Sequence, residues 1–113
     1  MDDDRQRIVA EAESKLFEKL SQMLEVLGDG NWSEHFRKVR EELTNAKTWA
    51  QKNAAAARIR LVYGGMGSFN DWHVDGNVDG MDFDDLRTEL YELSWTYERP
   101  EVARALLRKE GLA

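Results

Sequence analysis

Three glycines within four residues, Gly64, Gly65 and Gly67, interrupt a chain that follows helical patterns on both sides of them. Glycine adopts backbone angles that other residues adopt only at a cost in free energy, so these residues predict a tight turn between helices. Asn70 and Asp71 follow, and their short side chains can bond to nearby backbone groups and fix the turn. We expect residues 64–71 to form one glycine-rich loop, whose structural residues are Gly64, Gly65, Gly67, Ser68 and Asn70.

Before this loop, apolar residues recur every three or four positions, which is the spacing of one face of a helix. The first such stripe consists of Ile8, Ala12, Leu16, Leu20, Leu24 and Leu27. Three leading aspartates suit the positive end of the helix dipole, and Gly28 with Gly30 provides a stop signal. The sequence therefore predicts a long helix over residues 2–27.

A second helix is predicted from Asn31, a favourable N-cap with Glu34 three residues later, as in a capping box. Its end is poorly marked. Thr48 followed by Gln51 resembles another cap, so we place a break at residues 45–47 and begin a third helix at Thr48. One continuous bent helix is the alternative.

After the glycine-rich loop, Asp82 suits the N-cap of a fourth helix, whose apolar face would carry Phe83, Leu86, Leu90, Leu93 and Tyr97. Pro100 suits the first turn of a short fifth helix that ends at Gly111. No strand-like alternation persists long enough to predict a strand. We therefore predict a single all-α domain over residues 1–113, a bundle of four to five helices with a glycine-rich loop (64–71) and an acidic loop (72–82).

The net charge of −6 is distributed unevenly along the chain. Residues 69–92 contain eight Asp and Glu against one Arg, whereas residues 30–63 contain seven Lys and Arg against three Glu. A dominant acidic region disfavours nucleic acid as a ligand, because affinity there depends on neutralised phosphates, and it disfavours membrane surfaces similarly. It favours a partner protein with a basic surface.

The chain contains no cysteine, which excludes disulfides and thiolate chemistry. The N-terminus is acidic and has no apolar signal-peptide region, and no apolar run is long enough to span a bilayer. We expect a soluble cytoplasmic protein without a cofactor. The oligomeric state cannot be read from these patterns.

The segment Asp75-Gly76-Asn77-Val78-Asp79-Gly80 matches the opening of an EF-hand calcium loop. The match fails afterwards, because Asp82 stands where an apolar residue belongs and Leu86 stands where the bidentate glutamate belongs. A solvated turn leading into an acid-rich helix start is the preferred interpretation. A calcium-binding regulatory or structural module using residues 75–85 is the alternative function.

Other motifs give weak signals for chemistry. The glycines lack the preceding strand and the Gly-Lys-Ser/Thr ending of a phosphate-binding loop, and a helix C-cap with a tight turn explains them. His35 and His73 are the only histidines, and neither stands in a metal-ligand spacing. Ser68 has no base near it in the sequence. No catalytic set is complete, so we predict that the protein is not an enzyme and holds no metal.

Four tryptophans are many for a chain of 113 residues. Trp32, Trp49 and Trp95 fall within helical patterns and are expected to be core or half-buried. Large apolar contacts at either end of the third helix are expected from Trp49, Leu61 and Val62. Trp72 lies in the loop region, where an interface anchor and a cover for the helix ends are equally good interpretations.

The nonapeptide Tyr-Gly-Gly-Met-Gly-Ser-Phe-Asn-Asp at 63–71, with the helix motif Leu-Arg-x-x-Leu-Tyr-x-Leu at 86–93, resembles the signature of a family of small uncharacterised bacterial domains. The similarity covers about residues 15–97, and only the nonapeptide is specific. The resemblance implies an all-helical fold without an enzymatic role, and small acidic members look similar to immunity proteins of bacterial toxin systems. The acidic segment 75–85 departs from the usual pattern, which suggests that it is specific to a partner.

Charge and resemblance together predict an immunity-type protein that binds and neutralises a cognate toxin with a basic active-site surface. The residues expected to bind this partner are Asp71, Trp72, His73, Asp75, Asp79, Asp82, Asp84 and Asp85.

Overall fold

Five helices and one short hairpin make up the computed structural model, which describes residues 2–28, 31–63, 77–78 and 81–111. The helices are α1 (Asp2–Leu27), α2 (Asn31–Asn45), α3 (Trp49–Arg60), α4 (Phe83–Leu93) and α5 (Pro100–Lys109). The hairpin consists of β1 (Asn77–Val78) and β2 (Met81–Asp82). The predicted all-α fold class is confirmed, with the hairpin as the only strand pairing among the described residues.

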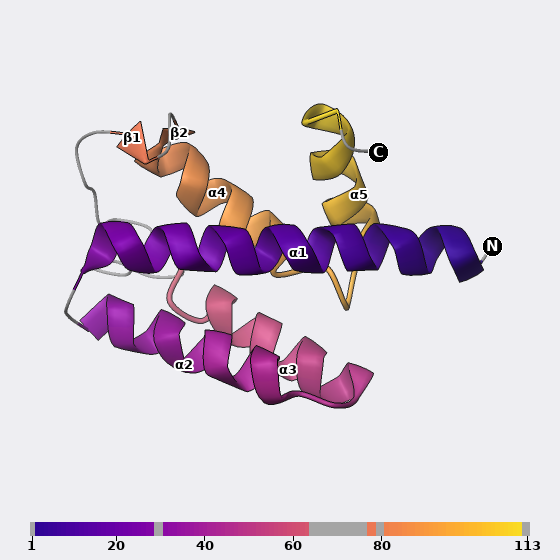
Figure 1. Cartoon of the computed structure of the whole chain (residues 1–113), viewed down its shortest axis with the longest axis horizontal. Helices are drawn as coiled ribbons and strands as arrows, with labels where there is room; N and C mark the ends of the chain where they lie inside the picture. The colour runs from indigo at the N-terminus through magenta and orange to yellow at the C-terminus, as the bar shows by residue number, and fades with distance from the viewer. Residues whose placement is uncertain (1, 29–30, 64–76, 79–80, 112–113) are drawn as a thin grey trace.

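Helix α1 is the centre of the arrangement and packs against α2, α4 and α5. Figure 1 shows α1 crossing the length of the molecule, with the antiparallel pair α2 and α3 along one side and α4 and α5 along the other. The hairpin packs against the start of α4, near the C-terminal end of α1 (Figure 1). A helix with neighbours on both sides needs a broad apolar face, and the stripe on α1 provides it.

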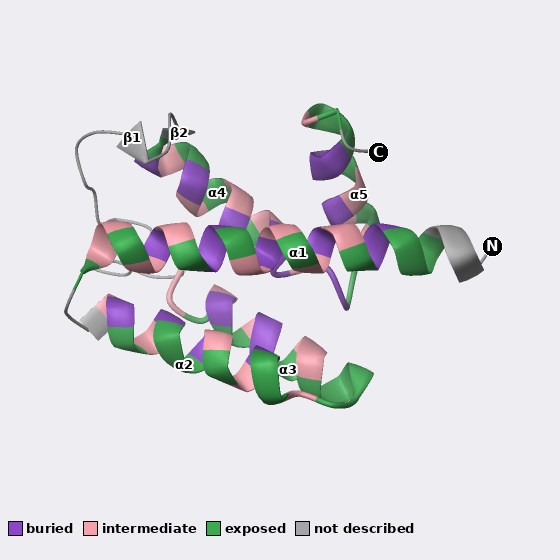
Figure 2. Cartoon of the chain, viewed as in Figure 1, coloured by how far each residue is buried: buried purple, intermediate pink, exposed green. Residues whose placement is uncertain are grey.

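Buried residues recur along each helix at the spacing that the sequence predicts (Figure 2). On α1 the buried residues include Ile8, Ala12, Leu16, Leu20 and Met23. On α4 they are Phe83, Leu86, Leu90 and Leu93. Each large apolar side chain that is fully buried contributes about 1.5–3 kcal/mol, so this shared core is the main source of stability.

The helix ends follow the predicted signals closely. Gly28 and Gly111 have positive φ angles of 64° and 78°, which only glycine adopts freely, and they follow the ends of α1 and α5. Thr48 accepts a hydrogen bond from the Gln51 backbone, and Gln51 bonds back, forming a complete capping box. This box starts α3 and separates it from α2, so the alternative of one bent helix is wrong.

Four sequence predictions need correction. The hairpin within the predicted acidic loop was not expected, because two-residue strands are too short to show alternation. Trp49 and Leu61 are 48% and 74% exposed, although their positions in the helical pattern predicted apolar packing. The fourth helix ends at Leu93 instead of continuing to Tyr97.

This early end of α4 has a local cause. The hydroxyl of Ser94 donates to the Tyr91 carbonyl at 2.5 Å, and that of Thr96 donates to the Leu93 carbonyl at 2.6 Å. Such local bonds compete with the helical ladder. The chain then turns through residues 94–98, and Tyr97 is still buried in the core.

Candidate functional site

The N-terminal end of α4 carries the described part of the predicted acidic site. Asp82 occupies the N-cap position, although its side chain makes no capping bond, and it is exposed together with Asp85. Asp84 forms an ion pair with Arg87 at 2.8 Å, which neutralises part of its charge. Carboxylates are stabilised at a helix N-terminus by the dipole, so the sequence can place three of them here at little cost.

The hairpin leads directly into this end of α4. Asn77 pairs with Asp82 and Val78 with Met81, which leaves two residues, Asp-Gly, between the paired positions. Asp-Gly is among the most typical sequences of a tight hairpin turn. The pairing of Asn77 and Val78 with Asp82 and Met81 therefore fits a short hairpin that leads directly into α4.

Several predicted site residues lie outside the described residues. In the loop these are Gly64, Gly65, Gly67, Ser68 and Asn70, and in the partner-binding set they are Asp71, Trp72, His73, Asp75 and Asp79. The alternative of a calcium loop stays a prediction for the same reason. Among the described residues, no group of three or more His, Cys, Asp or Glu could hold a metal ion.

Tyr63, the last described residue before the predicted glycine-rich loop, is fastened to α4. Its hydroxyl donates to the Arg87 carbonyl oxygen at 2.8 Å, and its ring lies 5.2 Å from that of Tyr91. Burial raises the pKa of the Tyr63 phenol, so this hydroxyl stays protonated and keeps donating. Tyr63 and the hairpin, the described residues on either side of residues 64–76, therefore both contact α4.

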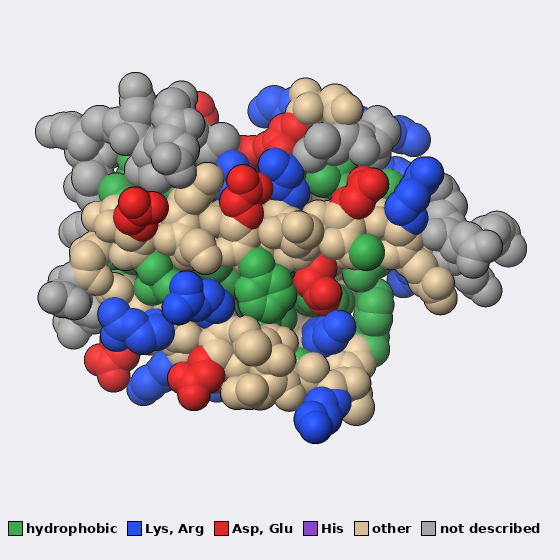
Figure 3. Space-filling view, viewed as in Figure 1, with side chains coloured by type: hydrophobic (Ala, Val, Ile, Leu, Met, Phe, Trp, Pro, Cys, Tyr) green, Lys and Arg blue, Asp and Glu red, His purple; other side chains and the backbone are tan. Residues whose placement is uncertain are grey.

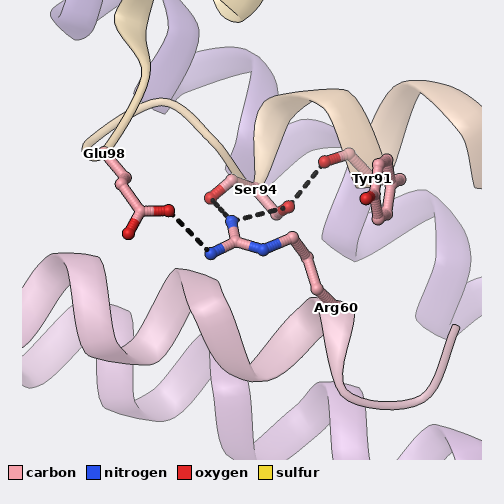
Figure 4. Close-up of polar contacts among 4 residues, drawn as sticks. All are labelled: Arg60, Tyr91, Ser94 and Glu98. Atoms are coloured by element: carbon pink, nitrogen blue, oxygen red, sulfur yellow. Dashed lines mark hydrogen bonds and ion pairs between the residues drawn. The ribbon is translucent and has the colours of Figure 1, made fainter. Parts of the chain in front are cut away.

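A second contact, made by Arg60, holds the other end of α4. The guanidinium of Arg60 donates to the Ser94 carbonyl at 2.7 Å, to the Ser94 hydroxyl at 3.2 Å and to Glu98 at 3.4 Å (Figure 4). It also lies 3.5 Å from the ring centroid of Trp95. Ser94 follows the last residue of α4, where carbonyl groups lack helical partners and a cation is favoured.

Sequence reasoning missed Arg60 and the anchoring role of Tyr63. Arg60 is the last residue of α3 and Tyr63 lies three residues after it, and their partners lie 34 and 24 positions further along the chain. The one available signal was the resemblance described above, in which Tyr63 opens the nonapeptide. Arg60 had no comparable signal.

Lys and Arg side chains gather over α2 and α3 on the face shown in Figure 3. Several of them are paired: Lys38 lies 3.7 Å from Glu34, and Arg58 lies 3.4 Å from Glu42. The ring of His35 donates from Nε2 to the Arg58 carbonyl at 2.8 Å, which ties α2 to the end of α3. His35 is thus a structural contact between helices.

Comparisons with known proteins give one match. A family model described as a domain of unknown function, DUF6966, matches residues 25–81. The match covers the end of α1, the α2–α3 pair and the segment through the hairpin to Met81. No curated protein and no solved structure matches the chain. Among the described residues, none of the helices has the length and apolar character needed to cross a bilayer.

Proposed function

Because the chain belongs to the DUF6966 family, whose description states no function, we propose from its own charge and geometry that it is an immunity-type protein. It binds a cognate bacterial toxin in the cytoplasm and neutralises it through the acidic region that ends at α4. The proposed contact residues that the structure describes are Asp82, Asp84 and Asp85. Asp71, Trp72, His73, Asp75 and Asp79 extend the same contact region along the sequence.

The observation that carries this proposal is the exposure of Asp82 and Asp85 at a helix end that is held firmly in place. Phe83 and Leu86, which alternate with these acids, are fully buried, so the helix cannot rotate its acidic face away from solvent. Tyr63 and Arg60 fasten α3 to the same helix. Acidic groups on a helix that is already held in place bind at a lower entropic cost than groups that must be ordered during binding.

The expected partner carries a basic surface of the kind found in enzymes that act on nucleic acids or nucleotides. Such enzymes bind phosphates with Lys and Arg, and a cluster of carboxylates competes for the same groups. Long-range attraction between the two charge patterns speeds association. Apolar contacts near the acids, for which Trp72 is the candidate, slow dissociation.

The test uses the product of the gene adjacent to the one that encodes this chain, purified together with it. Affinity is measured by calorimetry at low and at physiological salt for the wild type and for the double variant Asp82→Lys with Asp85→Lys. We expect the variant to bind at least about tenfold more weakly, mainly through a slower association rate. Because the side chain of Asp82 makes no capping bond, far-UV circular dichroism should stay unchanged.

The matched control reverses two exposed carboxylates elsewhere, Glu25→Lys on α1 and Glu41→Lys on α2. It changes the net charge by the same amount and should alter affinity by no more than about threefold. Equal losses in both double variants would show that overall charge acts and not this site. An unchanged affinity of the Asp82 and Asp85 variant at low salt would overturn the proposal.

A further inference from the structure

A pocket of about 440 Å³ lies between the N-terminal half of α1, the start of α3 and the turn that carries Tyr97. Its lining consists of Arg5, Gln6, Val9, Ala10, Glu13, Trp49, Lys52 and Tyr97. The acidic end of α4 lies near the other end of α1 (Figure 1), so this pocket is separate from the proposed toxin-binding site. Its volume falls within the range of small-molecule sites.

The wall of the pocket includes a flat aromatic surface that solvent reaches. Trp49 is 48% exposed although it belongs to the first turn of α3. Its ring meets the ring of Tyr97 edge to face, with centroids 5.3 Å apart and an interplanar angle of 86°. This contact fixes the orientation of the indole, and a fixed indole face stacks against planar rings. Val9 and Ala10 add aliphatic surface from α1.

The polar groups of the pocket are organised around Glu13. Its carboxylate accepts a hydrogen bond from the Tyr97 hydroxyl and lies 3.2 Å from the ammonium group of Lys52. Burial raises the pKa of Tyr97, so the phenol remains a donor across the physiological range. Because Lys52 and Glu13 form an ion pair, the net positive charge of the lining comes from the exposed Arg5.

We propose that this pocket binds a small planar aromatic carboxylate, with the ring against Trp49 and the carboxylate toward Arg5 and Lys52. The aromatic wall selects a flat apolar body, and the two cations against one carboxylate select an anionic group. Guanidinium groups bind carboxylates with two parallel hydrogen bonds, which gives Arg5 the larger share of the selectivity for an anion. This inference is independent of the toxin-binding proposal.

The test uses 2-naphthoate as the probe, titrated into the full chain and followed by two-dimensional NMR. Chemical shifts are expected to change at the indole of Trp49 and at backbone amides of residues 5–13, with a submillimolar Kd. Two analogues serve as controls: neutral 2-naphthamide should bind at least fivefold more weakly, and cationic 2-naphthylmethylamine more weakly still. Equal or tighter binding of the cationic analogue would overturn the assignment of an anionic ligand.

Variants separate the two contacts. Arg5→Gln should weaken 2-naphthoate at least fivefold while leaving 2-naphthamide unchanged, because only the carboxylate contact is lost. Trp49→Ala should weaken both probes, and its melting curve shows whether the fold survives the loss of the Tyr97 contact. Lys47→Gln, at an exposed lysine two residues before Trp49 and outside the lining, is the control and should change neither affinity. Absence of shifts at millimolar 2-naphthoate, or wild-type affinity of Arg5→Gln, would overturn the proposal.

Discussion

Helix α4 is held on its two sides by contacts of opposite chemistry. Toward α3, the cation of Arg60 binds the C-terminal end of the helix. Toward α5 and α1, Glu89 shares a side-chain hydrogen bond with Glu110, and Lys19 and Lys15 lie near this pair. The first contact joins a charge to the dipole that favours it, whereas the second brings two like charges together.

The difference lies in how each contact responds to pH. Arg60 carries its charge at any pH at which the protein folds, so its bonds to Ser94 are constant. Burial, the hydrogen bond that the protonated Glu89 carboxyl donates to Glu110, and nearby carboxylates raise the pKa of Glu89 to about 7, although Lys19 opposes the rise. The contact between Arg60 and Ser94 is therefore independent of pH, whereas the contact between Glu89 and Glu110 changes with protonation near neutral pH.

The largest expected effect is the loss of the permanent contact. Arg60→Ala removes two hydrogen bonds to Ser94 and the stacking on Trp95, so the Ser94 carbonyl loses its charged donor while the Ser94 hydroxyl keeps its bond to Tyr91. We expect a loss of about 2–3 kcal/mol in the free energy of unfolding. Urea titrations at pH 5.5 and pH 8 should give the same loss, because no proton is involved.

Arg60→Lys is the control for charge alone. It keeps the cation but cannot make the forked contact or stack in the same way, so it should recover less than half of the loss. Full recovery would mean that the dipole and not the geometry holds this end of α4. A loss with Arg60→Ala that changes strongly with pH would break the contrast between the two sides.

The sequence predicted the helices more completely than the contacts that join them. The periodic apolar residues, the glycines at 28 and 111 and the Thr48 box are local signals, and each was confirmed. Arg60 and Ser94 lie 34 positions apart, and nothing in the sequence near either residue indicates the other. The predicted burial of Trp49 was wrong for a related reason, since the position of a residue in a helical pattern does not tell whether another element covers that face of the helix.

The candidate acidic site could be predicted from composition, because the acidic and basic residues of a segment can be counted without knowing the fold. Its described geometry could not, since the hairpin depends on pairing between Asn77 and Asp82 across a turn. The pocket beside Trp49 was not predicted at all. It needs α1, α3 and the turn at Tyr97 to meet, which are three segments far apart in the chain.

A smaller effect is expected from the loss of the hydrogen bond that Tyr63 makes to α4. Tyr63→Phe removes the hydrogen bond to the Arg87 carbonyl while keeping the ring against Tyr91. The loss should be about 1 kcal/mol, because one neutral hydrogen bond is lost from a partly buried position. Since burial raises the pKa of this phenol, the loss measured by urea titration should be the same at pH 6 and pH 9. A loss that disappears at pH 9 would mean that the hydroxyl ionises in the folded state.

The smallest expected effect concerns the proton-sensitive side, and it has the opposite sign. The pKa of Glu89 rises on folding from 4.5 to about 7, so the folded state is favoured when this group is protonated. That contribution is fully present below about pH 4.5 and is lost as the pH rises through about 7. Glu89→Gln keeps a neutral polar group at every pH, and it should therefore stabilise the protein at pH 8 and not at pH 4.5.

Because solvent reaches this pair and screens it, the gain at pH 8 should be only about 0.5–1 kcal/mol. Urea titrations of Glu89→Gln and wild type across pH 4.5–8.5 measure it as two curves that diverge through neutrality. Glu101→Gln, an exposed carboxylate on α5, should give no such divergence and serves as the control. Parallel curves for Glu89→Gln and wild type would mean that Lys19 neutralises Glu89 fully, and the two sides of α4 would then not differ in their response to protons.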